Sequence, residues 1–90
     1  MTYQVIVGRE AKMKIEKLDR SIAERIRGQL RKLAASPFDP RISNQLKTAP
    51  ERRYTRVGDW RIVYEVNETQ SVIEVSTIQH RSRVYKEIKK

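Results

Sequence analysis

The chain has 90 residues, of which 38% are hydrophobic, and 20 Lys and Arg against 11 Asp and Glu give a net charge of +9. This length predicts a single domain, residues 1–90, with one modest core. The lack of cysteine excludes disulfides, thiolate nucleophiles and zinc–cysteine sites. No apolar run approaches the ~18 residues of a membrane span, and the N-terminus lacks the layout of a secretory signal. We therefore expect a cytoplasmic protein with no membrane partner.

The positive charge is spread along the chain rather than gathered in a tail. Residues 1–45 carry 10 basic and 5 acidic side chains, and residues 46–90 carry 10 and 6. The excess must therefore lie on the folded surface, where it attracts nucleic acid or an acidic protein and speeds encounter with either.

The first half of the chain predicts a strand followed by two helices. Residues 3–7 alternate as a strand does, and Gly8 ends it. Apolar side chains then recur every three or four residues, which is one face of a helix. Asp19 and Ser21 favour helix N-caps, so the pattern divides into helices at 9–18 and 21–35 that form a hairpin. The prolines at 37 and 40 end the second helix.

The second half predicts a loop over 36–50, with Leu46 as its anchor, and strands at 52–57, 60–67 and 71–78 joined by two turns. The tail, residues 82–90, has the spacing of a short helix. The order β-αα-βββ-α is an α+β fold with helices on a mainly antiparallel sheet. The plausible core positions of these strands are Val63, Ile73 and Val75, with Ile62, Tyr64 and Val66 on the opposite pleat.

Arginine and aromatic side chains cluster in these strands. Alternation places Arg52, Tyr54 and Arg56 on one face of their strand, and Arg61 begins the next strand across a two-residue turn. If the last strand lies beside the second, His80, Arg81 and Tyr85 can reach the same concavity. The remaining basic residues of the helices are expected to form a solvated face that steers a partner; they include Lys12, Lys14, Lys17, Arg25, Arg31 and Lys32.

This cluster suits cleavage of RNA by the substrate's own 2′-hydroxyl. Arginine stabilises the charge of a pentacoordinate phosphate, and Tyr54, Tyr85 or Trp60 could stack on an unpaired base. Tyr64 and Trp60 are more typical of core or edge positions. We expect no metal and no cofactor, because the sequence offers no cluster of ligands. Arginine holds its proton at neutral pH, whereas the imidazole of His80 can accept one.

Two segments, together with the helical hairpin that precedes them, resemble the RelE/ParE toxin superfamily. The resemblance extends over essentially the whole chain. Arg56-Val57-Gly58-Asp59-Trp60-Arg61-Ile62-Val63-Tyr64 resembles the family hairpin R-V-G-D-[YW]-R-[IV]-[IVL]-Y. Ile78-Gln79-His80-Arg81-Ser82-Arg83-Val84-Tyr85 is similar to the family ending [IV]-x-H-R-x-x-V-Y.

The resemblance implies a RelE-type toxin that cleaves messenger RNA in the 30S A site of the ribosome, without metal, and leaves a 2′,3′-cyclic phosphate. By position, Arg61 and Arg81 would stabilise the phosphate, Tyr85 would orient the substrate, and Arg56 takes a place where the family has Lys or Arg. Family members often carry a further basic residue where this chain has Tyr54, so the general base is left open between Tyr54, His80 and Arg56. The additional residues expected to bind RNA are Arg52, Arg83 and Lys86.

The resemblance also implies a small acidic, RelB-like antitoxin as partner. Two other functions stay open. The chain could be a ParE-like toxin directed at DNA gyrase, or a weakly active module that binds an antitoxin or acts as a co-repressor.

Overall fold

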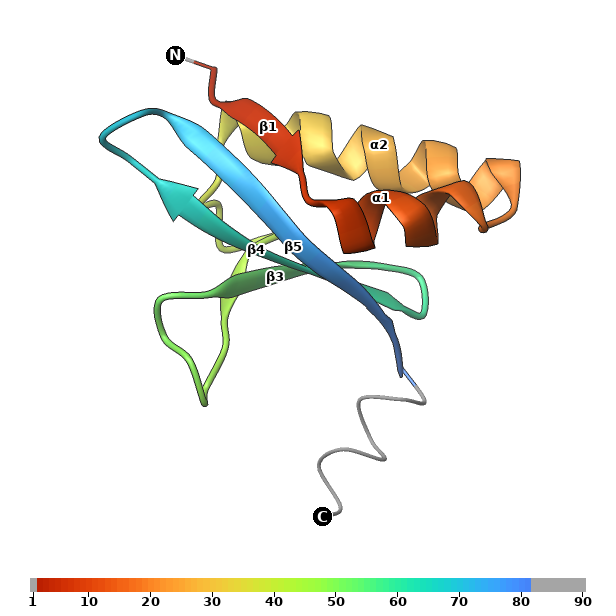
Figure 1. The fold of residues 1–90 in the computed structure, drawn as a ribbon. Helices are drawn as coiled ribbons and strands as arrows, with labels where there is room; N and C mark the ends of the chain where they lie inside the picture. Colours follow the sequence, from red (N-terminus) through yellow and green to blue (C-terminus); the bar gives the residue numbers. More distant parts are fainter. Residues whose placement is uncertain (1, 82–90) are drawn as a thin grey trace.

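Two helices cover one face of a five-stranded sheet in the computed structural model, which describes residues 2–81 (Figure 1). The predicted α+β fold is confirmed, while the predicted C-terminal helix, residues 82–90, lies outside the described residues. The elements in chain order are β1 (Gln4–Val7), α1 (Arg9–Glu16), α2 (Arg20–Ala35), β2 (Asn44–Gln45), β3 (Arg53–Val57), β4 (Trp60–Asn67) and β5 (Val72–His80).

The helical hairpin buries one apolar stripe against the sheet. Asp19 is the N-cap of α2, which confirms the predicted break between the helices, although its side chain makes no capping hydrogen bond. The buried residues that the helices contribute to the core are Ala11, Ile15, Ala23, Ile26, Leu30 and Leu33. Burying such a stripe supplies most of the stability of short helices.

The sheet has the order β1-β5-β4-β3-β2. β1 is parallel to β5, and the other pairs are antiparallel. The turn between β3 and β4 contains Gly58, whose φ of 58° lies in the left-handed region that favours glycine. This turn places β3 and β4 side by side, as the sequence predicts.

An extra residue in β5 changes which face its side chains occupy. Val63 pairs with Thr77 and Tyr64 with Val75, so Ser76 has no partner opposite it. Its hydroxyl donates a hydrogen bond of 3.2 Å to the Val63 carbonyl. The bulge reverses the alternation, because it inserts one residue into a period of two.

The register between β4 and β5 corrects the predicted grouping of core residues. Ile62 and Tyr64 lie in the same buried cluster as Ile73 and Val75, facing the helices. Val63 is only 3% exposed but lies on the opposite face of the sheet, outside that cluster. The prediction that the side chain of Val63 shares a face of the sheet with Ile73 and Val75 is therefore wrong.

The segment 36–50 is not wholly a loop, since it contains the two-residue strand β2. Ile42, rather than Leu46, is its half-buried apolar residue that packs on the core. Among residues 2–81 no helix is long and apolar enough to cross a membrane.

A chain of hydrogen bonds ties this segment to the sheet. The Tyr64 hydroxyl donates to the Pro37 carbonyl at 3.0 Å, so the Ser43 hydroxyl must donate to Tyr64. Arg53 Nε in turn donates to Ser43 Oγ at 2.6 Å. Because Tyr64 is fully buried, losing its partners would leave polar groups unsatisfied.

Candidate functional site: an arginine–tyrosine surface

The face of the sheet that points away from the helices carries the candidate site. Cross-strand partners share a face, and the register aligns Arg56 with Arg61 and Arg61 with Gln79 in one row across β3, β4 and β5. The next row is Tyr54, Val63 and Thr77. We call these six positions the open-face surface. The predicted placement of Tyr54, Arg56 and Arg61 on one face is confirmed.

Tyr54 is the aromatic centre of this surface. The guanidinium carbon of Arg61 lies 4.3 Å from the centroid of its ring, and that of Arg56 lies 5.9 Å from it. Both distances are within the range of cation–π attraction. Tyr54 and Arg61 are half-buried, whereas Arg56 is exposed. The ring therefore holds two cations close together and in place, where like charges would otherwise repel.

No carboxylate forms a salt bridge with either of these arginines within the described part of the chain, residues 2–81. Their positive charge is therefore available for an anion. Guanidinium groups match phosphate oxygens through paired hydrogen bonds. A surface of two guanidinium groups beside one aromatic ring can bind the phosphate and the base of a single-stranded nucleotide.

Arg52 lies beside this surface rather than in it. Its Nε is 3.7 Å from a carboxylate oxygen of Glu65, and both side chains are about half exposed. An exposed ion pair of this kind contributes little to stability. Arg52 keeps a cation at the edge of the surface, but Glu65 neutralises it.

Arg81 follows directly on β5. Its backbone N–H donates to the Asp59 carbonyl at 2.7 Å, which continues the sheet to the β3–β4 turn. The side chain is exposed. The other predicted site residues, Arg83, Tyr85 and Lys86, lie outside the described residues.

His80 lies on the opposite face of the sheet from Arg61. It pairs with Trp60, and their rings meet edge to face with centroids 5.0 Å apart. The expected convergence of His80 with the arginines in one concavity is therefore wrong, and the physical reason is the bulge at Ser76. Without that extra residue, position 80 would share the face of Arg61.

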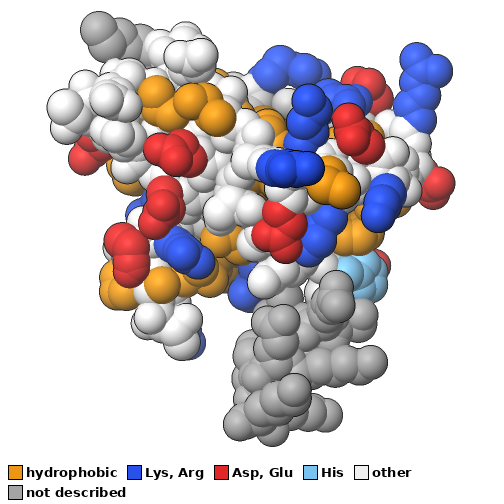
Figure 2. Space-filling model, in the orientation of Figure 1, with side chains coloured by type: hydrophobic (Ala, Val, Ile, Leu, Met, Phe, Trp, Pro, Cys, Tyr) orange, Lys and Arg blue, Asp and Glu red, His pale blue; other side chains and the backbone are white. Residues whose placement is uncertain are grey.

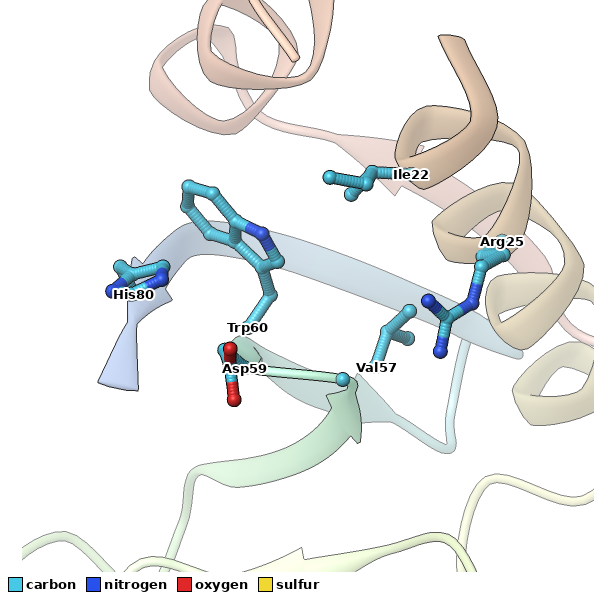
Figure 3. A pocket seen from close by; sticks show the side chains of 7 residues that line it. Ile22, Arg25, Val57, Asp59, Trp60 and His80 are labelled. Carbon is cyan, nitrogen blue, oxygen red and sulfur yellow. The ribbon is translucent and has the colours of Figure 1, made fainter. Parts of the chain in front are cut away.

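His80 instead lines a separate pocket under α2. The lining residues are Ile22, Arg25, Val57, Gly58, Asp59, Trp60 and His80. In Figure 3 the Trp60 ring stands between His80 and Ile22, and Arg25 reaches down from α2. Trp60 also packs on the core, as expected of an edge aromatic. The pocket has a volume of about 370 Å³ and shares no residue with the open-face surface.

Two residues near the site carry roles that the sequence pattern did not reveal. Gln79 belongs to the open-face surface, directly beside Arg61. Lys14, expected on a solvated face, instead donates a 3.0 Å hydrogen bond to the Ile78 carbonyl. β1 pairs with β5 only up to Val75, so Lys14 occupies the edge of β5 that β1 leaves open.

The wider surface is basic but mixed. Figure 2 shows Lys and Arg side chains gathered over the two helices, with acidic side chains among them. Such a distribution attracts polyanions over a long range without forming a specific contact. No cluster of three or more His, Cys, Asp or Glu that could hold a metal occurs within residues 2–81.

Comparison with known proteins agrees with this architecture. The model of the family described as the ParE toxin of the type II toxin–antitoxin system parDE matches residues 5–85. No curated protein sequence matches the chain.

Solved structures of toxins share the fold. The RelBE2 toxin–antitoxin complex of Mycobacterium tuberculosis matches with a TM-score of 0.79 and 19% identity, over 90% of this chain and 100% of that one. The archaeal RelE–RelB complex from Pyrococcus horikoshii matches with a TM-score of 0.78 and 23% identity, over 92% and 99%. The isolated E. coli RelE toxin matches with a TM-score of 0.76 and 23% identity, over 96% and 94%. The family match over nearly the whole chain, together with this fold, shows that the chain belongs to the RelE/ParE superfamily of type II toxins.

Proposed function

We propose that the protein is a ribosome-dependent endoribonuclease that cleaves messenger RNA in the 30S A site and so inhibits translation. The observation that supports this most is the pair of guanidinium groups held against Tyr54 on the open-face surface. An open sheet face suits a single strand presented by a larger assembly, because no deep pocket has to admit it.

The chemistry needs only the substrate and these side chains. The 2′-oxygen attacks the adjacent phosphorus, the bond to the 5′-oxygen breaks, and a 2′,3′-cyclic phosphate forms. Arg61 and Arg56 contact the phosphate oxygens as negative charge accumulates on them. Arg81, next to the β3–β4 turn, supplies a third cation toward the leaving 5′-oxygen, which takes up a proton from water as its bond to phosphorus breaks.

The proton of the 2′-hydroxyl needs an acceptor. His80 faces the pocket on the other side of the sheet, which disfavours it for that role. Tyr54 is at the surface itself, and its ring lies within cation–π distance of both arginines. As the phenolate, the Tyr54 side chain is therefore the preferred acceptor among the three candidates left open by the sequence. Tyr85 would orient the substrate.

The partner that we propose is an acidic, RelB-like antitoxin. Two of the similar solved structures are complexes of RelE-type toxins with their antitoxins. The net charge of +9 favours an acidic polypeptide. A messenger RNA target also implies that this single-domain protein acts in the cytoplasm.

A cell-free bacterial translation extract tests this function. Protein is added to an extract that translates a reporter, and the new 5′ ends are mapped by primer extension. The proposal expects cuts within translated codons that disappear when translation initiation is blocked. Cuts outside the reading frame, or no cuts from folded protein, would contradict it.

The family match favours one second candidate, a toxin directed at DNA gyrase, because the matching model is that of the ParE toxin. This candidate predicts inhibition of purified gyrase in a supercoiling assay and no change in the reporter message. A protein inactive in both assays would instead be the antitoxin-binding or co-repressor module.

A further inference from the structure

Two polar members of the open-face surface, Gln79 and Thr77, are not used by the proposed chemistry. The Thr77 hydroxyl accepts a 3.5 Å hydrogen bond from Lys14 Nζ, which leaves Gln79. Gln79 pairs directly with Arg61, which in turn pairs with Arg56. Directly opposed residues on one face have Cβ atoms about 5 Å apart. Gln79 therefore stands beside the guanidinium groups, on the strand next to them.

The side chain of Gln79 is available to a ligand. It is half-buried, so β5 and its neighbours restrict where it can point. Among the described residues its carboxamide has no hydrogen-bond partner. A carboxamide offers two N–H donors and one carbonyl acceptor.

These groups match the edge of a nucleobase. Single-stranded RNA is recognised through bases that stack on aromatic rings or guanidinium planes and are read by hydrogen bonds along their edges. Arg61 and Tyr54 supply the stacking surface and the phosphate contact. Gln79, which can both donate and accept hydrogen bonds, lies in the same row as Arg56 and Arg61, on the strand next to Arg61.

The bulge at Ser76 is what puts Gln79 there. In a regular strand the residue opposite Arg61 would differ by one, and position 79 would face the helices. The bulge thus exchanges a histidine for a glutamine on the open face. A bulge beside a site often serves to re-aim a side chain in this way.

We propose that Gln79 is a specificity-determining residue, which reads the Watson–Crick edge of the base held on Arg61 and Tyr54. This inference rests on the proposed function and adds the group that selects among nucleotides. Gln79 contacts the base and not the phosphate, so it alters which sites are cut more than how fast the phosphodiester breaks.

The test measures base preference in two ways. Cleavage sites in a reporter message are mapped for the wild type, Gln79→Ala and Gln79→Glu. Binding is measured with four uncleavable single-stranded probes, 2′-O-methyl oligoribonucleotides of A, C, G and U. A bidentate contact to one base discriminates by about tenfold or more, so Gln79→Ala should flatten the preference by that factor.

Gln79→Glu should change the order of preference, because a carboxylate accepts hydrogen bonds but donates none. Gln4→Ala is the matched control. Gln4 pairs with Val72 of β5 on the same side of the sheet, about 23 Å along the strand from Gln79 at about 3.3 Å per residue. This variant should keep the wild-type preference and the wild-type affinities.

The outcomes separate the two proposals. Wild-type cuts and wild-type probe ratios in both Gln79 variants would overturn the role of Gln79 and leave the nuclease intact. A changed probe ratio without any cleavage would support base reading by Gln79 and contradict the proposed activity. Equal loss of binding to all four probes, with a lowered melting temperature, would make Gln79 a structural residue and overturn its role in selection.

Discussion

The guanidinium of Arg61 lies 4.3 Å from the centre of the Tyr54 ring, on the face of the sheet that the helices leave uncovered. The two residues come from neighbouring strands and are one row apart in the register. This contact orients Arg61 and gives the open-face surface both a fixed cation and an aromatic ring. The proposed activity depends on that combination.

Arg61→Ala should relieve the growth arrest caused by expression and lower cleavage by about 100-fold to 1,000-fold, as losing one transition-state contact typically does. Arg61→Lys should recover only part of the activity, because an ammonium group lacks the planar fork. Growth and reporter cleavage are measured at equal expression. Arg31→Ala, which changes an exposed arginine of α2, is the control and should remain toxic. Full toxicity of Arg61→Ala would remove Arg61 from the site.

Tyr54→Phe separates the ring of Tyr54 from its hydroxyl. The ring alone keeps the cation–π contacts with Arg56 and Arg61, so Tyr54→Phe should retain RNA-probe binding while Tyr54→Ala weakens it. If the phenolate oxygen of Tyr54 accepts the 2′-proton, cleavage by Tyr54→Phe should nevertheless fall by about 100-fold or more. Wild-type cleavage by the Phe variant would exclude Tyr54 as general base.

Lys14→Met tests how the open edge of β5 is held. The methionine keeps an apolar stem but cannot donate to the Ile78 carbonyl, so the loss should cost about 1 kcal/mol. Relative to the wild type, Lys14→Met should accelerate amide hydrogen exchange at the C-terminal end of β5 more than in β4. Lys12→Met, at an exposed position of the same helix, should leave exchange unchanged. Equal exchange in both variants would show that Lys14 does not hold this edge.

Tyr64 should make the folded state sensitive to high pH. Burial raises the pKa of its hydroxyl above the ordinary value, and the hydrogen bonds from Ser43 and Arg53 only partly oppose this. An unfolded tyrosine titrates near ~10, so above that pH the unfolded chain binds fewer protons than the folded one. The stability that the raised pKa of Tyr64 gives the folded state is therefore fully present below about pH 10. It is lost as the pH rises through the pKa of Tyr64 in the folded protein.

The matching variant is Tyr64→Phe. This substitution should lower the free energy of unfolding by about 1–3 kcal/mol at neutral pH, because the Pro37 carbonyl and the Ser43 hydroxyl lose their hydrogen-bond partner. Urea unfolding between about pH 8 and pH 11 should show the wild type losing its advantage as tyrosine titrates. If the difference in the free energy of unfolding between the wild type and Tyr64→Phe stayed constant over this pH range, the proposed role of Tyr64 would be contradicted.

The strand order around Arg61 follows from local patterns in the sequence. Residues 53–67 form a hairpin with a glycine turn, so the side chains at Tyr54, Arg56 and Arg61 could be assigned to one face by alternation alone. Such assignments hold where a strand is regular and its turn is short.

The sides of β5 could not be assigned in that way. The bulge residue Ser76 places every later side chain of β5 on the face opposite to the one that simple alternation predicts. Gln79 therefore lies on the open face, and His80 lies on the helix face. The buried residues do contain a sign of this, since Ile73, Val75 and Ile78 are spaced by two and then by three. Long-range pairing also escaped prediction, because the contacts of Lys14 and of Ile42 depend on elements far away in the sequence.

The most direct test of the central claim compares one message in two states. The same messenger RNA is offered to the purified protein either free in solution or on ribosomes stalled with a defined codon in the A site, and cleavage is read by primer extension. We predict a cut inside the A-site codon only on the ribosome, lost with Arg61→Ala and kept with Arg31→Ala. Equal cleavage of free RNA, or an intact message on the stalled ribosome, would contradict the proposed function.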